Sequence, residues 1–152
     1  MPTITKLAAL VLFAVLAMLG VDWYVALLPE PPQNPRLGLL LGVIGAATGW
    51  MFVGGQITGA PLRGVWIGLQ GALLTILSAL VVVSVVGVFQ GGYRRQYDGV
   101  MEALMGAFEI ALVHGQRMLD PDFLLRVGAG GAVCGVMLAI IFRLAEARRL
   151  DR

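Results

Sequence analysis

An uncharged stretch of thirty residues, 64–93, limits the possible folds of this chain more than any other feature. A helix needs about 20 mostly apolar residues to cross the hydrocarbon core of a bilayer. Because backbone amide groups find no water inside lipid, such a run must be helical or belong to a closed barrel. The apolar residues are continuous rather than alternating, which favours a helix. We therefore predict a transmembrane helix over residues 64–90.

Three further apolar runs predict an all-α integral membrane bundle of four transmembrane helices in a single membrane domain, residues 1–152. They cover residues 7–28, 37–57 and 123–142. The composition agrees, since 59% of residues are hydrophobic and 13% are charged, against about 25% charged in a typical soluble domain. This composition excludes a soluble enzyme, a disordered tail and a nucleic-acid-binding domain.

The first run has a second interpretation, because Lys6 ahead of an apolar stretch is also typical of a secretory signal peptide. No convincing A-x-A cleavage site follows it. We interpret residues 7–28 as a retained span that ends at the prolines of residues 29–32, which lack the amide donor that a helix needs.

Residues 97–119 show a different pattern, with apolar side chains on one broad helical face and acidic side chains in a narrow stripe beside it. This predicts an amphipathic helix that lies on the membrane surface. The apolar face consists of Met101, Leu104, Met105, Phe108, Leu112 and Leu119, and the stripe of Asp98, Glu102 and Glu109.

The distribution of basic residues predicts the orientation. Four spans place both termini on one side of the membrane, with six basic residues against five on the other side. The acidic residues divide two against seven. Basic residues favour the cytoplasmic side, so we expect both termini in the cytoplasm of a bacterial inner-membrane protein and the amphipathic helix in the periplasm.

Eight of the 21 glycines form pairs spaced four residues apart, which let helix backbones approach closely. We interpret them as packing positions inside the bundle, with a docking face for another membrane protein as the alternative. The pairs are Gly38 and Gly42, Gly45 and Gly49, Gly64 and Gly68, and Gly131 and Gly135.

Polar residues near the spans have plain structural interpretations. Asp22 stands beside Trp23 and Tyr24, a pattern typical of the aromatic belt at a membrane interface, and we favour an interfacial anchor over an ion or proton site. We interpret Gln70 as an interhelical hydrogen-bond donor and Arg126 as a side chain that reaches the headgroups.

We expect no metal site, no cofactor and no catalytic residue. Asp98 and Glu102 could together bind a divalent cation, but carboxylates on an exposed face are more often solvated. The lone histidine, His114, lies about 160° around the helix from Asp98, and we interpret it as a surface residue rather than a ligand of a macrocycle metal. Cys134 is the only cysteine, so neither an intrachain disulfide nor a CxxC pair can form.

Several short segments, in order along nearly the whole chain, resemble the TrgA family of small bacterial membrane proteins. They are MPTITKLAAL at residues 1–10, LLPE at 27–30, RRQYDG at 94–99, EAL at 102–104 and LDP at 119–121. The resemblance implies a location in the cytoplasmic membrane and a link to tellurite resistance. It implies no catalytic residues and supplies no mechanism.

Arg94 and Arg95 stand where the third span meets the amphipathic helix, so they could clamp lipid phosphates or the acidic groups of a partner. Two functional hypotheses follow for the whole chain. One is a non-enzymatic membrane protein that contributes to tellurite or envelope-stress tolerance. The other is an accessory subunit of a larger bioenergetic complex, such as a photosynthetic core–antenna or respiratory assembly. Membrane lipids are the expected partners, with other subunits docking through the glycine-lined faces and nucleic acid excluded.

Overall fold

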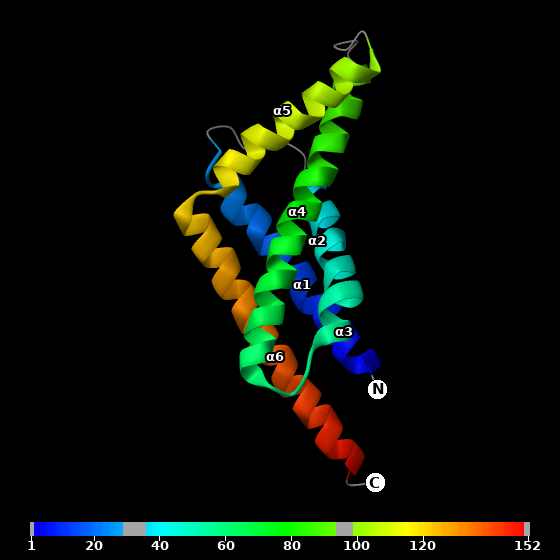
Figure 1. Ribbon diagram of the computed structural model, residues 1–152, viewed down its shortest axis with the longest axis vertical. Coiled ribbons are helices and arrows are strands. Elements are labelled where there is room, and N and C mark those ends of the chain that lie inside the picture. The colour runs from blue at the N-terminus through cyan, green and yellow to red at the C-terminus, as the bar shows by residue number, and fades with distance from the viewer. Residues whose placement is uncertain (1, 29–35, 94–98, 151–152) are drawn as a thin grey trace.

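The structure is a computed structural model that describes residues 2–28, 36–93 and 99–150, and the regular elements in these ranges are all helices (Figure 1). Within them, four helical stretches are long and apolar enough to cross a membrane, which confirms the predicted all-α fold with four spans. These candidate spans are Ile4–Val25, Leu37–Gln56, Pro61–Phe89 and Pro121–Ala147.

The helices that contain these spans extend beyond most of the predicted bounds. Helix α1 is Pro2–Val25, α4 is Pro61–Tyr93 and α6 is Pro121–Leu150. Both α4 and α6 begin with proline, whose missing amide donor costs nothing in the first turn of a helix. The Asp120 side chain caps α6 by accepting hydrogen bonds from the backbone amides of Asp122 and Phe123, at 3.0 and 3.2 Å.

The second span is interrupted by one wide helical turn, which the sequence did not predict. It consists of α2 (Leu37–Thr48), the π-helical segment η1 (Gly49–Val53) and α3 (Gly54–Gln56). The Gly54 amide donates to the Gly49 carbonyl, five residues earlier. Residues five apart point in different directions in a regular α-helix, whereas this wider turn lets both glycines lie against α1, Gly49 on Ala9 and Gly54 on Lys6.

Glycines set the contact between α4 and α6. Gly64 lies against Gly135, and Gly68 lies against Gly131. A Cβ atom on Gly64 would stand 2.6 Å from the Gly135 carbonyl oxygen, and Cβ atoms on the other three would also collide with the facing helix. The two backbones therefore touch along this stretch, which is the close approach that small residues permit in a membrane.

The contact between α1 and α2 has the same character. Gly45 lies on the backbone of Phe13, and Gly42 lies on the Met18 side chain. Phe13 is fully buried, together with Val53 and Leu138, so these side chains mark the centre of the bundle.

The predicted amphipathic helix is α5, Val100–Met118. It runs obliquely from the end of α4 that lies far from the chain termini towards the start of α6 (Figure 1). None of its residues is buried. Its apolar face is turned away from the other helices, with Met105 exposed to 69% and Phe108 to 65%, while Ile110 points towards Gly87 of α4.

Candidate functional site

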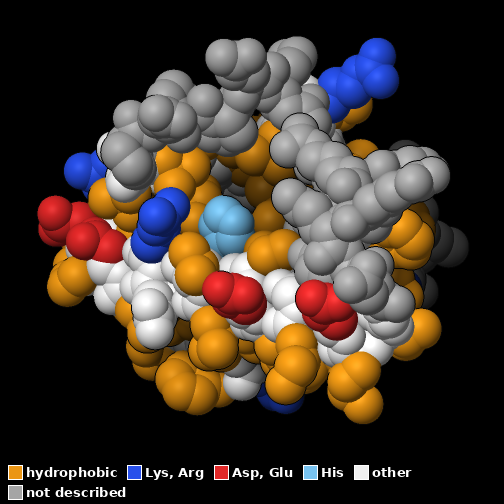
Figure 2. All heavy atoms as spheres, turned by 90° about the horizontal axis from the view of Figure 1, so that it is seen from above, with side chains coloured by type: hydrophobic (Ala, Val, Ile, Leu, Met, Phe, Trp, Pro, Cys, Tyr) orange, Lys and Arg blue, Asp and Glu red, His pale blue; other side chains and the backbone are white. Residues whose placement is uncertain are grey.

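A cavity of about 590 Å³ lies between α5 and the end of the bundle that α5 covers. Residues of α1, α2, α4, α5 and α6 line it, and most of them are apolar. Its deeper wall includes Leu16, Ala72 and Val127, which are all buried. Viewed from the α5 end, the surface is hollowed, hydrophobic side chains form the floor and the single histidine stands at the rim (Figure 2).

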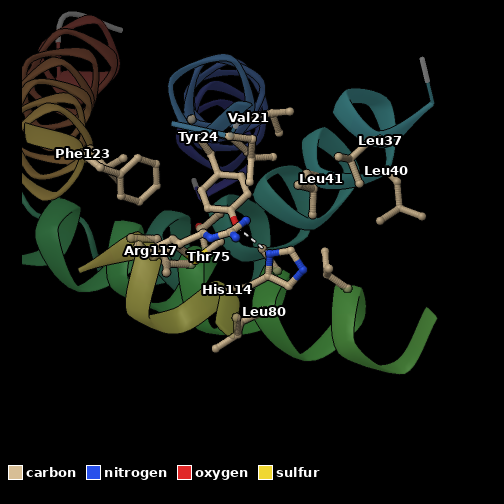
Figure 3. Close-up of a pocket in the computed structure, with 18 of the residues that line it drawn as sticks. Val21, Tyr24, Leu37, Leu40, Leu41, Thr75, Leu80, His114, Arg117 and Phe123 are labelled. Carbon is tan, nitrogen blue, oxygen red and sulfur yellow. Dashed lines mark hydrogen bonds between the residues drawn. The ribbon is translucent and has the colours of Figure 1, made fainter. Parts of the chain in front are cut away.

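The polar groups of the cavity are concentrated where α1 meets α5. The Tyr24 hydroxyl group lies 2.5 Å from Nδ1 of His114, within hydrogen-bond distance, and the two rings are tilted with centroids 5.9 Å apart (Figure 3). Phe123 of α6 packs edge-on against the Tyr24 ring, at 6.1 Å between centroids. Residues from two other helices, α5 and α6, therefore hold this tyrosine of α1 in place.

Arg117 completes this group. It follows His114 by three residues on α5, so the two side chains project from the same side of the helix. The Arg117 guanidinium group lies beside the Tyr24 hydroxyl group (Figure 3), where it acts on this group through its charge and is placed to donate a hydrogen bond to it. The Tyr24–His114–Arg117 cluster is the name used below for these three residues.

The surroundings of His114 favour the neutral imidazole. Burial lowers its pKa below the usual value of 6.5, and the positive charge of Arg117 lowers it further. At neutral pH the ring is therefore uncharged, so it can donate one hydrogen bond and accept one.

The cavity has a polar end and an apolar end. Tyr24 lies at the end of the first candidate span and Phe123 lies near the start of the fourth. Arg36, which also lines the cavity, immediately precedes α2. The polar groups are thus near the limits of the spans, whereas Leu16 and Ala72 lie further along them.

Thr75 and Ser84 add no free hydroxyl group to this polar end. The Thr75 hydroxyl, in the cavity wall, donates to the Gly71 carbonyl at 2.8 Å, and Ser84 makes the same bond to Leu80. Such bonds within one helix satisfy a polar side chain in an apolar surrounding.

His114 corrects the sequence interpretation, because it is a half-buried residue bonded to another helix rather than a surface residue. Gln70 is a second correction, since it is exposed on α4 and no bond from it to a second helix is found among the described residues. Asp22, Glu102 and Glu109 are exposed.

Seven of the eight paired glycines lie against another helix, and Gly38 is the exception, with no atom within 4 Å of an added Cβ. Arg94, Arg95 and Asp98 lie outside the described residues. Among the residues that the structure does describe, no group of three or more His, Cys, Asp or Glu side chains could hold a metal ion.

Sequence reasoning did not single out Arg117 and assigned Tyr24 only to an aromatic belt. One signal was present, because His114 and Arg117 are spaced to share a face of the amphipathic helix.

Comparison with protein families, with curated proteins and with solved structures finds no match to this chain.

Proposed function

We propose that this chain is a non-enzymatic multi-pass membrane protein that binds an amphipathic small molecule in the cavity between its helices. The observation that supports this is the cavity of about 590 Å³, apolar along its depth and polar at one end. Small-molecule sites commonly measure about 300–1,000 Å³. The apolar part of the ligand would lie beside Leu16 and Val127, and its head beside the Tyr24–His114–Arg117 cluster.

The membrane supplies such ligands directly. An amphiphile in a bilayer keeps its head at the interface and its chain in the hydrocarbon core, and the cavity has the same order along the spans. The apolar face of α5 is exposed, as expected of a helix that rests on lipid. We propose that this end of the bundle faces the periplasm of a bacterial inner membrane, with both termini in the cytoplasm.

The resemblance to the TrgA family supports a physiological role in tellurite or envelope-stress tolerance. Deletion of the gene should then make cells more sensitive to tellurite, and the wild-type gene should restore tolerance. Normal tolerance in the deletion strain would contradict this role, whatever the cavity binds.

An accessory subunit of a bioenergetic complex is the other proposal. Seven of the glycines that suggested it contact helices of the same chain, so they offer no face to a neighbouring subunit. Gentle extraction followed by native gel electrophoresis tests this alternative. Migration with a large complex would favour it, and migration as a 16.1 kDa chain in a micelle would oppose it.

The cavity itself is tested by filling it. Gly20 lines the cavity, and a Cβ atom on it meets nothing within 4 Å. The substitution Gly20→Leu should therefore occupy the space without displacing protein atoms. Gly38→Leu is the matched control, because Gly38 is equally open and is not part of the cavity wall.

Native mass spectrometry of the gently extracted protein provides the measurement. We expect a bound amphiphile on the wild-type protein and on Gly38→Leu, and loss of it from Gly20→Leu. Equal occupancy in all three proteins, or none in any, would contradict the proposed function.

A further inference from the structure

The hydrogen-bond chemistry of the cavity's polar end restricts what it can recognise. An arginine side chain has five N–H donors and no acceptor. Arg117 must therefore be the donor in its interaction with Tyr24, and the Tyr24 oxygen is the acceptor. The single hydroxyl proton of Tyr24 is then available for its other neighbour, Nδ1 of His114.

This arrangement favours one tautomer of the neutral histidine. With the tyrosine proton directed to Nδ1 of His114, the neutral ring carries its own proton on Nε2. In Figure 3 this second ring nitrogen points away from Tyr24. As a residue of the cavity wall, His114 therefore has a donor rather than an acceptor free of Tyr24.

The charged side chains described in the cavity wall are all basic. Among the described residues of the cavity wall, the charged side chains are Arg36 and Arg117, and none is acidic. At the polar end, Arg117 thus presents N–H donors and a positive charge, while the Thr75 hydroxyl is used within its own helix. A ligand head that complements this set must present acceptor oxygens and a negative charge.

We infer that the cavity binds an anionic amphiphile, with an alkyl chain along the apolar wall and a carboxylate or phosphate head that accepts hydrogen bonds from Arg117 and His114. This inference rests on the proposed function, since it names the class of molecule that the same cavity holds. Carboxylate and phosphate share the required chemistry, and they are separated below by experiment.

Competition between ligands of equal chain length tests the inference. The full-length protein is placed in an uncharged maltoside detergent with a fluorescent dansyl-labelled fatty acid as the probe. Dodecanoate, dodecyl phosphate, dodecanol and dodecyltrimethylammonium then compete for the site. We expect at least one of the two anions to displace the probe roughly tenfold more strongly than dodecanol, the size of effect that a charge-assisted hydrogen bond gives.

Variants assign the preference to the polar end. Arg117→Gln should reduce the ratio of anion to dodecanol affinity towards one, while dodecanol still binds and so reports a folded cavity. Arg126→Gln is the control, because Arg126 is an exposed arginine of α6 outside the cavity wall. His114→Asn keeps an acceptor near the Nδ1 position but has no donor at the Nε2 position. The longer side chain of His114→Gln places its amide N–H near the Nε2 position. We therefore expect His114→Asn to weaken anion binding more than His114→Gln does.

The outcomes separate the inference from the proposed function. If dodecanol or a neutral alkyl quinone competes as well as both anions, and Gly20→Leu abolishes that competition, the cavity binds amphiphiles and the inference of an anionic head is wrong. If Gly20→Leu leaves the competition by every ligand unchanged, the proposed function fails as well. Preference for dodecanoate identifies a carboxylate head, and preference for dodecyl phosphate identifies a phosphate head.

Discussion

The Tyr24 hydroxyl group lies 2.5 Å from Nδ1 of His114 and joins the end of α1 to a residue ninety positions later in the chain. This bond matters for α5 because none of the residues of that helix is buried. Together with Arg117 and the contact of Ile110 with Gly87, it positions α5 over the bundle, where α5 forms the outer wall of the cavity.

Removal of the Tyr24 hydroxyl should loosen α5. We expect Tyr24→Phe to lower the free energy of unfolding by about 1 kcal/mol, the net contribution of a typical hydrogen bond. Hydrogen exchange of the α5 amides should accelerate more than that of α4. Trp66→Phe, a change at an exposed aromatic residue of α4, is the control. Unchanged exchange in α5 would show that the bond does not hold this helix.

The protonation of His114 should depend on its neighbours. Its pKa lies below 6.5 because of burial and, second, the Arg117 charge. The unfolded chain therefore binds this proton more readily, so the protein should be fully stabilised above pH 6.5 and lose stability as the pH falls through the lowered pKa. His114→Gln should reduce this pH dependence.

Nitrogen NMR can follow this titration directly, because the chain has one histidine. We expect a midpoint below 6.5 in the wild-type protein and a higher midpoint in Arg117→Gln. A wild-type midpoint at or above 6.5 would contradict the described surroundings of the ring.

The contact between α4 and α6 should tolerate no side chain. In Gly68→Ala the new Cβ atom would collide with the Gly131 carbonyl oxygen, and overpacking of this kind costs about 1–3 kcal/mol. Gly38→Ala is the control, since that position is open and alanine is favoured over glycine in a helix. Thermal unfolding should show opposite signs for the two substitutions, and equal effects would argue against close packing at Gly68.

The orientation is tested by reporter fusions. A reporter that is active only in the cytoplasm should function when fused after Arg152, and one inserted between α5 and α6, after Leu119, should function only in the periplasm. The reverse pattern would place the cavity on the cytoplasmic side and would contradict the proposed orientation.

The sequence predicted the spans well because the length and continuity of an apolar run decide whether a helix can cross lipid. It was less accurate about helix ends. The apolar part of the fourth run stops at Phe142, but α6 continues to Leu150, because a helix can extend past the hydrocarbon core into water. The wide turn at η1 was not predictable from local pattern, since it depends on the contacts of Gly49 and Gly54 with α1.

Most of the candidate site could not be predicted from the sequence. A helical wheel relates His114 to other residues of its own helix, whereas its bonding partner belongs to α1. Glycine spacing likewise predicted close contacts, but it did not indicate that Gly64 and Gly68 face Gly135 and Gly131. Such partners depend on how the helices are arranged in three dimensions.

Photo-crosslinking tests the central claim, that an alkyl chain lies inside the bundle, most directly. A dodecanoate with a photoactivatable diazirine near the end of its chain is bound to the full-length protein, irradiated and mapped by peptide mass spectrometry. The account predicts adducts on the deep cavity wall, at Leu16, Ala72 or Val127, that disappear in Gly20→Leu. Adducts confined to outward-facing residues such as Leu39, Val43 and Met51 would contradict it.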